Sequence, residues 1–417
     1  MLSMDAVRSH FPALASGAIF FDNPGGTQVV QEALQRLQHY ILHSNANHGG
    51  VFRTTLATEE IVDGTRQAVA DFLNAEQAEE IVFGPNMTTL TLLISRSLAH
   101  RLQPGDEIVV TRLDHDANVT PWRLIAEERG CTVRMVDFRV EDCTLDMAAM
   151  EQQITERTKI VAVGYASNAV GTINDVRRVV QMAHAVGALC FIDAVQYAPH
   201  RTIDVQELDC DFLACSVYKF FGPHLGVLYG KYELLDSLKS YQVRPAIQKP
   251  PYKFETGTKS FEALAGTLGV MEYFTWLGES AGSEFAPTYC ERYSGRRLLL
   301  KQGMAAIEAY ELGLNEALLA RLSSLANARV LGITDPQRMH ERVPTFSITV
   351  PRYTPRELAA MLNKADIYTW DGNFYALELS EYLGLEEQGG MLRIGLVHYN
   401  TVDEVERLIA ALEAGIR

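Results

Sequence analysis

Two short apolar runs each end next to a residue that could do chemistry. Ala188 to Ile192 is followed by Asp193, and Phe212 to Val217 is followed, one residue later, by Lys219. Short apolar runs bounded by polar or turn residues are typical of buried parallel strands. Ligands in open α/β sheets bind outside the carboxyl ends of the strands, so both side chains are predicted to face one ligand. A lysine that forms a Schiff base and a carboxylate that keeps a pyridine nitrogen protonated are what pyridoxal phosphate chemistry needs.

Each of these residues also has an ordinary interpretation. Lys219 could be a surface lysine, but its neighbours CSVY and FFGP place its backbone near the core. A desolvated lysine has a lowered pKa and forms imines more readily. Asp193 could instead cap a helix. Gln196 could bond the phenolic oxygen of a cofactor or lie in a first helical turn, and His115 could stack on an aromatic cofactor or lie in a polar loop.

A phosphate site is predicted where a strand passes into a helix. Residues 84–89, GPNMTT, include Met87 and Thr88 at the expected helix start. Free N–H groups and the helix dipole attract phosphate there, and Thr88 adds a hydroxyl. The segment 253–258, KFETGT, offers a further hydroxyl and flexible amides, although its pattern alone indicates only a turn.

The elements that position these residues alternate between strands and helices from residue 80 onward. The pattern predicts strands at 80–83, 107–111, 132–138, 159–163, 188–192, 212–217 and 225–229, and helices at 29–42, 58–73, from 84–89 to about 100, at 176–186 and at 262–277. Residues 44–55 are predicted to form a loop. This cadence indicates an α/β fold with a mainly parallel sheet between two layers of helices.

In the remainder of the chain, helices are mixed with short strands. Helices are predicted at 291–312, 355–363 and 402–414, with strands at 345–350 and 391–396. We therefore expect an N-terminal arm (1–20) that packs on the small domain, a large domain (21–275) and a smaller α+β C-terminal domain (276–417).

Composition excludes several classes of function. The 417 residues are 47% hydrophobic and 21% charged, with a net charge of −15, so nucleic acid and anionic membranes are poor partners. The six cysteines form no CxxC pair, and no metal site is predicted. No run reaches the roughly 18 apolar residues of a membrane span, and the N-terminus lacks a signal-peptide pattern. We expect a cytoplasmic protein.

Taken together, these residues resemble the class V, fold-type I pyridoxal phosphate enzymes of the cysteine desulfurase and selenocysteine lyase branch. The resemblance runs from Phe21 to Leu412. Residues 193–196, DAVQ, are similar to the family's D-x-x-Q, and residues 216–219, SVYK, to its S-x-H-K, with tyrosine in place of histidine. Residues 114–118 and 121–122, DHDAN and PW, are similar to E-H-H-A-N…P-W, which makes His115 the residue that stacks on the cofactor ring.

Three further motifs extend the resemblance. Asn168 begins an N-x-x-G segment that lies near the phenolic oxygen in the family. Residues 254–258 resemble F-E-x-G-T, which implies that Gly257 and Thr258 reach the phosphate of the partner subunit in a homodimer. Arg393 begins a segment similar to R-x-S-x-x-x-Y-N, whose arginine binds the substrate carboxylate, a role that suits a planar guanidinium.

One departure from the family concerns the mobile loop that carries the persulfide-forming cysteine. Where the family has R-x-G-H-H-C-A, this chain has residues 370–376, WDGNFYA. Tyr375 takes the place of the cysteine and Trp370 that of the arginine. A phenol cannot form a persulfide, and no cysteine follows Cys290.

The resemblance implies an enzyme that binds an amino acid as an external aldimine, with Lys219 as the base at Cα. We expect carbon–sulfur or carbon–selenium lysis by β-elimination on a cysteine-type substrate. Transamination, epimerisation and a non-catalytic role beside a sulfur-transfer system stay open. The expected catalytic residues are Lys219, His115 and Asp193; the cofactor contacts add Met87, Thr88, Asn168, Gln196, Ser216, Gly257 and Thr258; the substrate contacts are Arg393, Asn373, Tyr375 and His48.

Overall fold

A seven-stranded sheet forms the centre of the larger part of the molecule. The structure, a computed structural model, describes residues 2–416. The strand order is β2-β10-β9-β8-β7-β3-β4. Their bounds are β2 Ile81–Gly84, β3 Glu107–Thr111, β4 Thr132–Val136, β7 Thr158–Gly164, β8 Leu189–Asp193, β9 Phe212–Ser216 and β10 Gly226–Gly230. β4, β3, β7, β8 and β9 pair in parallel, whereas β10 is antiparallel to both of its neighbours, β9 and β2. The predicted mainly parallel sheet is confirmed.

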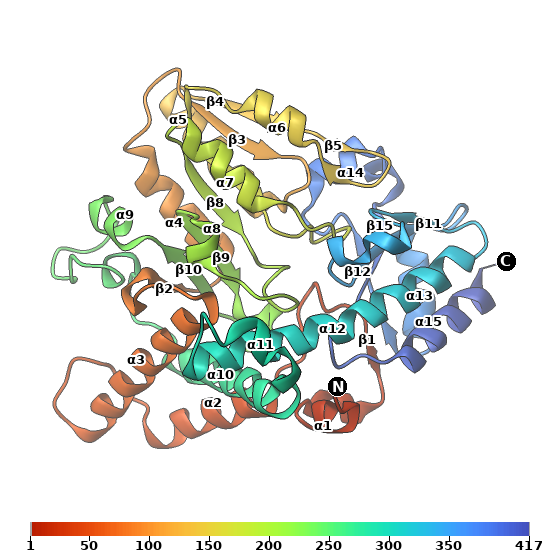
Figure 1. The fold of residues 1–417 in the computed structure, drawn as a ribbon, viewed down its shortest axis with the longest axis horizontal. Coiled ribbons are helices and arrows are strands. Elements are labelled where there is room, and N and C mark those ends of the chain that lie inside the picture. The colour runs from red at the N-terminus through yellow and green to blue at the C-terminus, as the bar shows by residue number, and fades with distance from the viewer. Residues whose placement is uncertain (1, 417) are drawn as a thin grey trace.

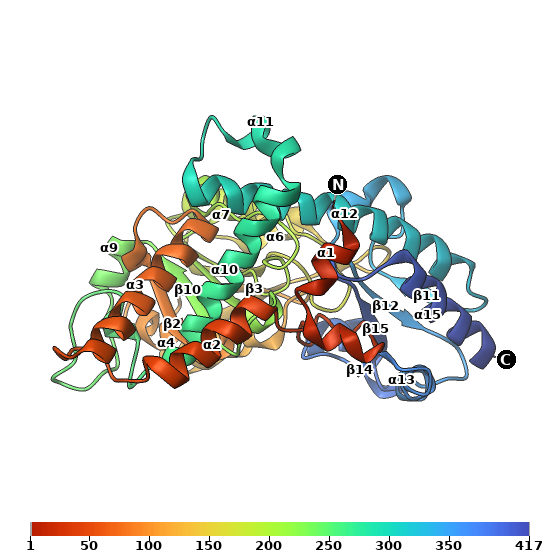
Figure 2. The same cartoon turned by 90° about the horizontal axis from the view of Figure 1, so that it is seen from below.

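Helices cover both faces of this sheet because successive strand residues point to opposite sides. Val109 packs into one core, and its neighbours Ile108 and Val110 pack into the other. The first core is covered by α3 (Arg53–Leu73), α7 (Val176–Ala185) and α10 (Phe261–Ala281), and the second by α4 (Met87–Ala99), α5 (Thr120–Arg129) and α9 (Tyr232–Ser237). Figures 1 and 2 show α10 beside α2 (Gln31–His43) and α3, with which it packs.

A smaller antiparallel sheet organises the C-terminal part. Its order is β11 (Arg329–Leu331), β12 (Thr345–Thr349), β15 (Met391–Gly395) and β14 (Trp370–Gly372). It packs with α13 (Pro355–Asn363), α15 (Val402–Gly415) and the end of α12 (Gly295–Ser324) around a third core that contains Leu318, Phe346 and Leu392. In Figure 1, α12 runs from beside α10 into this C-terminal part.

The N-terminal segment runs along the C-terminal part. α1 (Met4–Ser9) carries Arg8, which donates to Glu404 on α15 at 2.9 Å. β1 (Ile19–Phe20) pairs in parallel with β13 (Ile367–Tyr368). The proposed boundary between residues 275 and 276 falls within the continuous helix α10, so the division into domains stays a proposal.

The remaining elements are short. They are β5 (Phe138–Arg139), β6 (Thr144–Leu145), α6 (Met147–Gln153), α8 (Val205–Leu208), α11 (Ala286–Tyr289) and α14 (Leu377–Tyr382), together with eight short 3₁₀ segments in the described chain. No helix within residues 2–416 is long and apolar enough to cross a membrane.

Two predicted helices differ from the structure by five residues or more at one end. α3 begins at Arg53, inside the predicted loop. Its polar first turns are compatible with a helix because the hydroxyls of Thr55 and Thr58 donate to backbone carbonyls of the preceding loop. α12 spans Gly295–Ser324 instead of 291–312. It continues through Gly313 because the apolar residues beyond that glycine, such as Leu318, stay packed in the third core.

Candidate active site

A cavity of about 1070 Å³ lies at the carboxyl ends of the central parallel strands. Strands β3, β7, β8 and β9 each contribute lining residues at or just after their last residue, as the fold class predicts. Eleven of the predicted site residues line it: Met87, Thr88, His115, Asn168, Asp193, Gln196, Ser216, Lys219, Asn373, Tyr375 and Arg393.

Lys219 reaches the cavity from a 3₁₀ turn, η4 (Val217–Lys219), that directly follows β9. Its amine donates to the backbone carbonyls of Pro24 and Gly25, the latter at 3.0 Å, and lies 4.8 Å from the ring centroid of Tyr218. Burial and the nearby Arg393 cation lower the pKa of Lys219 to about 7. A substantial share of the amine is therefore unprotonated near neutral pH.

Asp193 is the last residue of β8 and is 7% exposed. Its carboxylate accepts a hydrogen bond from the backbone N–H of Val195 at 2.9 Å, within a turn and not at the start of a helix. Burial raises the pKa of Asp193 to about 6, against the lowering effect of Lys219. Gln196 lies in the same turn, and its side-chain amide donates to the Pro24 carbonyl at 2.9 Å. The alternative of a first helical turn at these residues is wrong.

His115 follows β3 and faces the ring of Tyr375, with centroids 5.4 Å apart and an interplanar angle of 25°. Its Nδ1 accepts from the backbone N–H of Ala117 at 3.0 Å. Burial and the cations Lys219 and Arg393 lower the pKa of His115 to about 4, so the imidazole is neutral at pH 7. A neutral imidazole can stack on an aromatic ring without bringing a further positive charge into the cavity.

The helix start predicted to hold phosphate is well defined. α4 begins at Met87, and the side chain of Asn86 caps it by accepting from the Thr89 N–H at 2.9 Å. The Met87 N–H donates to the hydroxyl of Ser216 at 3.0 Å, which ties this turn to the end of β9. A Cβ at Gly226 would lie 2.4 Å from the backbone of Asn86, so only glycine lets β10 approach so closely.

Arg393 enters the cavity from β15 of the smaller sheet and is 4% exposed. Its guanidinium donates to the backbone carbonyl of Asn168 at 3.0 Å and lies 4.3 Å from the ring centroid of Phe374. One of its nitrogens, Nη2, is 3.6 Å from a carboxylate oxygen of Asp22. Burial lowers the pKa of Arg393 to about 10, so it stays a cation at neutral pH.

Residues 370–375 form a further part of the cavity wall. Phe374 and Tyr375 have φ angles of 57° and 61°, a left-handed conformation that is unfavourable for two consecutive bulky residues. Hydrogen bonds hold them there: the side chain of Asn168 donates to the Phe374 carbonyl, and the Asp116 N–H donates to the Tyr375 carbonyl, both at 2.7 Å. Asn373 accepts from the Tyr375 N–H at 3.0 Å.

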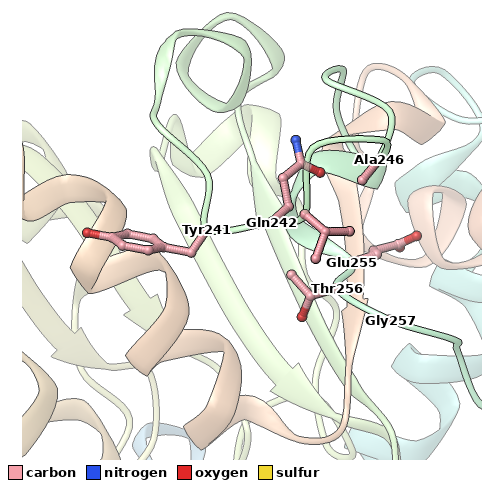
Figure 3. A pocket seen from close by; sticks show the side chains of 7 residues that line it. Tyr241, Gln242, Ala246, Glu255, Thr256 and Gly257 are labelled. Atoms are coloured by element: carbon pink, nitrogen blue, oxygen red, sulfur yellow. The ribbon is translucent and has the colours of Figure 1, made fainter.

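Three predicted site residues lie outside this cavity. Gly257 lines a second cavity of about 390 Å³ together with Tyr241, Gln242 and Glu255 (Figure 3). Thr258 and His48 are exposed, and the ring of His48 lies 5.8 Å from that of Phe261. Within one chain the structure does not bring them to Lys219, and their part in a site shared between two chains stays a proposal.

Several cavity residues were missed by the sequence reasoning. Asp22, Asp114, Asp116 and Glu386 all line the cavity. Asp114 is fully buried, accepts from Asn118 at 3.0 Å, and has its pKa raised to about 7 by burial. The one available signal for Asp22 was its place at the start of a Gly-rich turn.

The residues present fit a pyridoxal phosphate group. Two polar atoms of residues that line the cavity, the side-chain oxygen of Asn168 and Nε of Arg393, are buried without a hydrogen-bond partner. The Lys219 amine is bonded to carbonyls only and is not held in an ion pair by Asp193. A nucleophilic amine, a buried carboxylate and a capped helix start around one cavity are the donor set that an aldehyde, a pyridine nitrogen and a phosphate require.

Comparison with known proteins agrees with this arrangement. The aminotransferase class-V family profile matches residues 19–292 and 281–408. The chain belongs to this family. It is 33% identical to the aminotransferase-like protein FGM3 of Gibberella zeae, over 99% of this chain and 98% of that protein. It is 29% identical to a cysteine desulfurase of Pectobacterium carotovorum, over 98% and 97% of the two chains.

A solved structure of a cysteine desulfurase from Thermococcus onnurineus NA1, in its apo form, superposes with a TM-score of 0.86 at 27% identity, covering 100% of this chain and 98% of the other. The class V member described here is therefore a fold-type I, pyridoxal phosphate-dependent enzyme of the cysteine desulfurase type.

Proposed function

We propose that this class V enzyme is a carbon–sulfur or carbon–selenium lyase that cleaves a cysteine-type amino acid by β-elimination, without a persulfide cysteine. The observation that carries the proposal is the wall of the cavity at Tyr375. A phenol lies against His115 where a desulfurase would carry its cysteine, and none of the chain's cysteines lines the cavity. In β-elimination the thiol leaves directly, so no protein nucleophile is needed to accept the sulfur.

The roles of the residues follow from their chemistry. Bound pyridoxal phosphate supplies an electron-withdrawing ring that makes the Cα proton of an amino acid acidic. Lys219, with a pKa near 7, is suited to take that proton as a general base. Asp193, buried and anionic above its pKa of about 6, would hold the ring nitrogen. Arg393 would bind the substrate carboxylate, and Asn168 and Gln196 would bond the phenolic oxygen.

The walls of the cavity account for the remaining contacts. Met87 and Thr88 at the start of α4, with Ser216 at the adjoining end of β9, would hold the phosphate. His115 would stack on the ring, while Asn373 and Tyr375 would shape the side-chain pocket. Loss of the Cα proton and cleavage of the Cβ–S bond release a thiol, which takes up one proton. The remaining fragment takes up one water and yields pyruvate and ammonia.

The proposal includes a homodimer in which Gly257 and Thr258 complete the phosphate site of the partner subunit and His48 approaches its substrate. The exposure of Thr258 and His48, and the position of Gly257 at the second cavity, support such a contact.

Transamination and epimerisation use the same residues and remain the second candidates. A panel of L-cysteine, selenocysteine and cysteine S-conjugates separates the three reactions. Elimination gives pyruvate and one equivalent of thiol or selenide, transamination gives a keto acid that retains the side chain, and epimerisation gives only the D-amino acid. Production of keto acid or D-isomer without thiol would contradict the lyase proposal.

A non-catalytic role is tested by the same panel. A scaffold that merely carries the cofactor would show the imine absorbance and no turnover with any substrate. Tyr375→Phe provides a matched control for the nucleophile-free route. Elimination should retain at least about a third of its rate in this variant, because the phenol is proposed to shape the pocket and not to carry sulfur.

A further inference from the structure

A short turn at residues 22–26 links the two functional cations of the cavity. On one side, Asp22 forms a β-bridge with Gly395, two residues after Arg393, and the Gly395 N–H donates to the Phe21 carbonyl at 2.8 Å. On the other side, the carbonyls of Pro24 and Gly25 accept from Lys219. The turn therefore fixes the position of Arg393 relative to Lys219.

The carboxylate of Asp22 lies inside the cavity lining and points to Arg393. Its Oδ1 is 3.6 Å from Nη2 of Arg393, is buried, and has no hydrogen-bond partner. A Cβ at residue 25 would lie 2.5 Å from this oxygen, so Gly25 is required for the carboxylate to fold back over its own turn. The charged and titratable groups that face Asp22 are Arg393 from β15, Lys219 from η4 and the phenol of Tyr399.

The guanidinium of Arg393 offers a limited number of free donors. Nη1 is already bonded to the Asn168 carbonyl, whereas Nε has no partner. A carboxylate that binds an arginine in a bidentate manner uses two adjacent nitrogens, here Nε and Nη2. Nη2 is the nitrogen that faces Asp22, so a bound substrate carboxylate would lie next to a second carboxylate and be repelled by it.

We propose that Asp22 is a positioning residue that holds the guanidinium of Arg393 toward the cavity in the free enzyme and competes with the substrate's α-carboxylate for it. This inference rests on the proposed function, in which Arg393 binds that carboxylate. The negative charge of Asp22 therefore lowers the affinity for the substrate carboxylate.

A pH dependence follows from this competition. Burial raises the pKa of Asp22, although Arg393 and Lys219 oppose the shift. As pH falls through that raised value, Asp22 loses its charge and no longer repels the ligand carboxylate. The contribution of the carboxylate to binding should therefore increase at low pH in the wild-type holoenzyme.

Glycine and methylamine isolate this contribution. Both amines react with the cofactor and displace Lys219, but only glycine carries a carboxylate for Arg393. The apparent dissociation constant of each is measured from the change in the cofactor absorbance band, between pH 5 and pH 8. Both amines must lose a proton before they react, so this shared pH effect cancels in the ratio of the two dissociation constants.

In Asp22→Asn, which keeps the shape of the side chain, we expect the preference for glycine over methylamine to rise about three- to ten-fold above wild type at pH 8. The preference should also lose its dependence on pH. Asp116→Asn removes another carboxylate of the cavity, one bonded to Thr120 and not to Arg393, and should leave the ratio unchanged.

The inference is overturned if Asp22→Asn leaves the ratio unchanged or lowers it, or if both amines weaken equally, as they would after a general disturbance of the turn. Arg393→Gln separates this failure from failure of the proposed function. If Arg393→Gln abolishes the preference for glycine while Asp22→Asn has no effect, the carboxylate anchor stands and only the role of Asp22 is wrong. If Arg393→Gln leaves the preference intact, the anchor itself is wrong.

Discussion

At the scale of single residues, burial sets the ionisation that the proposed chemistry needs. It lowers the pKa of Lys219 to about 7 and that of His115 to about 4, and it raises that of Asp193 to about 6. At pH 7 the cavity therefore holds a partly free amine, a neutral imidazole and a carboxylate that is still mostly anionic. All three shifts have desolvation as their main cause, which is the effect expected where the sheet edge is enclosed by other parts of the chain.

The pKa of Lys219 predicts how the cofactor-free protein captures pyridoxal phosphate. Only the unprotonated amine attacks the aldehyde, so the capture rate should rise with pH through a midpoint near 7 and then level off. An exposed lysine would give a rise that continues to about pH 10. The rate is measured by stopped-flow absorbance at the imine band, about 410–430 nm.

Two variants control this measurement. Lys219→Ala should form no imine band at any pH. Arg393→Gln removes the like charge that lowers the pKa of Lys219, so the midpoint should move to higher pH. A midpoint near 10 in the wild type, or an imine band in Lys219→Ala, would place the reactive amine elsewhere.

At the scale of elements, the sequence predicted the helices and strands whose apolar residues form a regular local pattern. β3 and α13 have the predicted bounds, and β8 and β9 place Asp193 and Lys219 at one sheet edge. β14 was missed because its three residues, Trp370–Gly372, carry no alternating pattern and become a strand only by pairing with β15. The roles of segments 22–26 and 370–376 depend on long-range contacts that local periodicity does not contain.

The N-x-x-G segment shows why one of its residues must be glycine. Gly171 has a φ of 75°, and a Cβ there would lie 2.5 Å from the Thr345 carbonyl and 2.7 Å from the Val343 carbonyl. Gly171→Ala should lower the free energy of unfolding by about 3 kcal/mol, because left-handed strain adds to a clash with backbone that cannot move cheaply. Urea denaturation of the cofactor-free protein measures the loss.

Gly187→Ala is the matched control. Gly187 has nearly the same φ, 76°, but nothing lies within 4 Å of a Cβ built on it. Only the conformational cost remains, about 1 kcal/mol. Equal losses in the two variants would show that the close approach of residues 343–345 to Gly171 does not matter for stability. That approach aligns β12 with the Asn168 segment and therefore helps to place Asn168 against Arg393.

At the scale of the whole molecule, the chain has a second cavity besides the one around Lys219. Arg66 and Glu255 form a buried ion pair at 2.7 Å, and Glu255 also accepts from the Phe83 N–H, which ties the start of the 255–258 segment to β2. Beyond this anchor, Gly257 lies at the second cavity (Figure 3), which Val243 also lines. The apolar side chains there, Val243 at 70% exposed and Ile247 at 54%, are the kind of surface that a partner subunit covers.

The proposed dimer predicts that subunit association and cofactor affinity are coupled. The wild type should sediment at about twice its chain mass of 46.4 kDa. Val243→Glu would bury an unpaired carboxylate at the contact, so it should give a monomer. This monomer should bind pyridoxal phosphate at least about ten-fold more weakly, because Gly257 and Thr258 no longer reach the partner's phosphate site.

Val402→Glu, at a 48% exposed residue on α15, is the control and should stay dimeric with unchanged affinity. Sedimentation velocity and fluorescence titration measure the two properties. A monomeric Val243→Glu that keeps wild-type affinity would mean that each chain completes its own phosphate site, and the proposed sharing through residues 257–258 would be wrong.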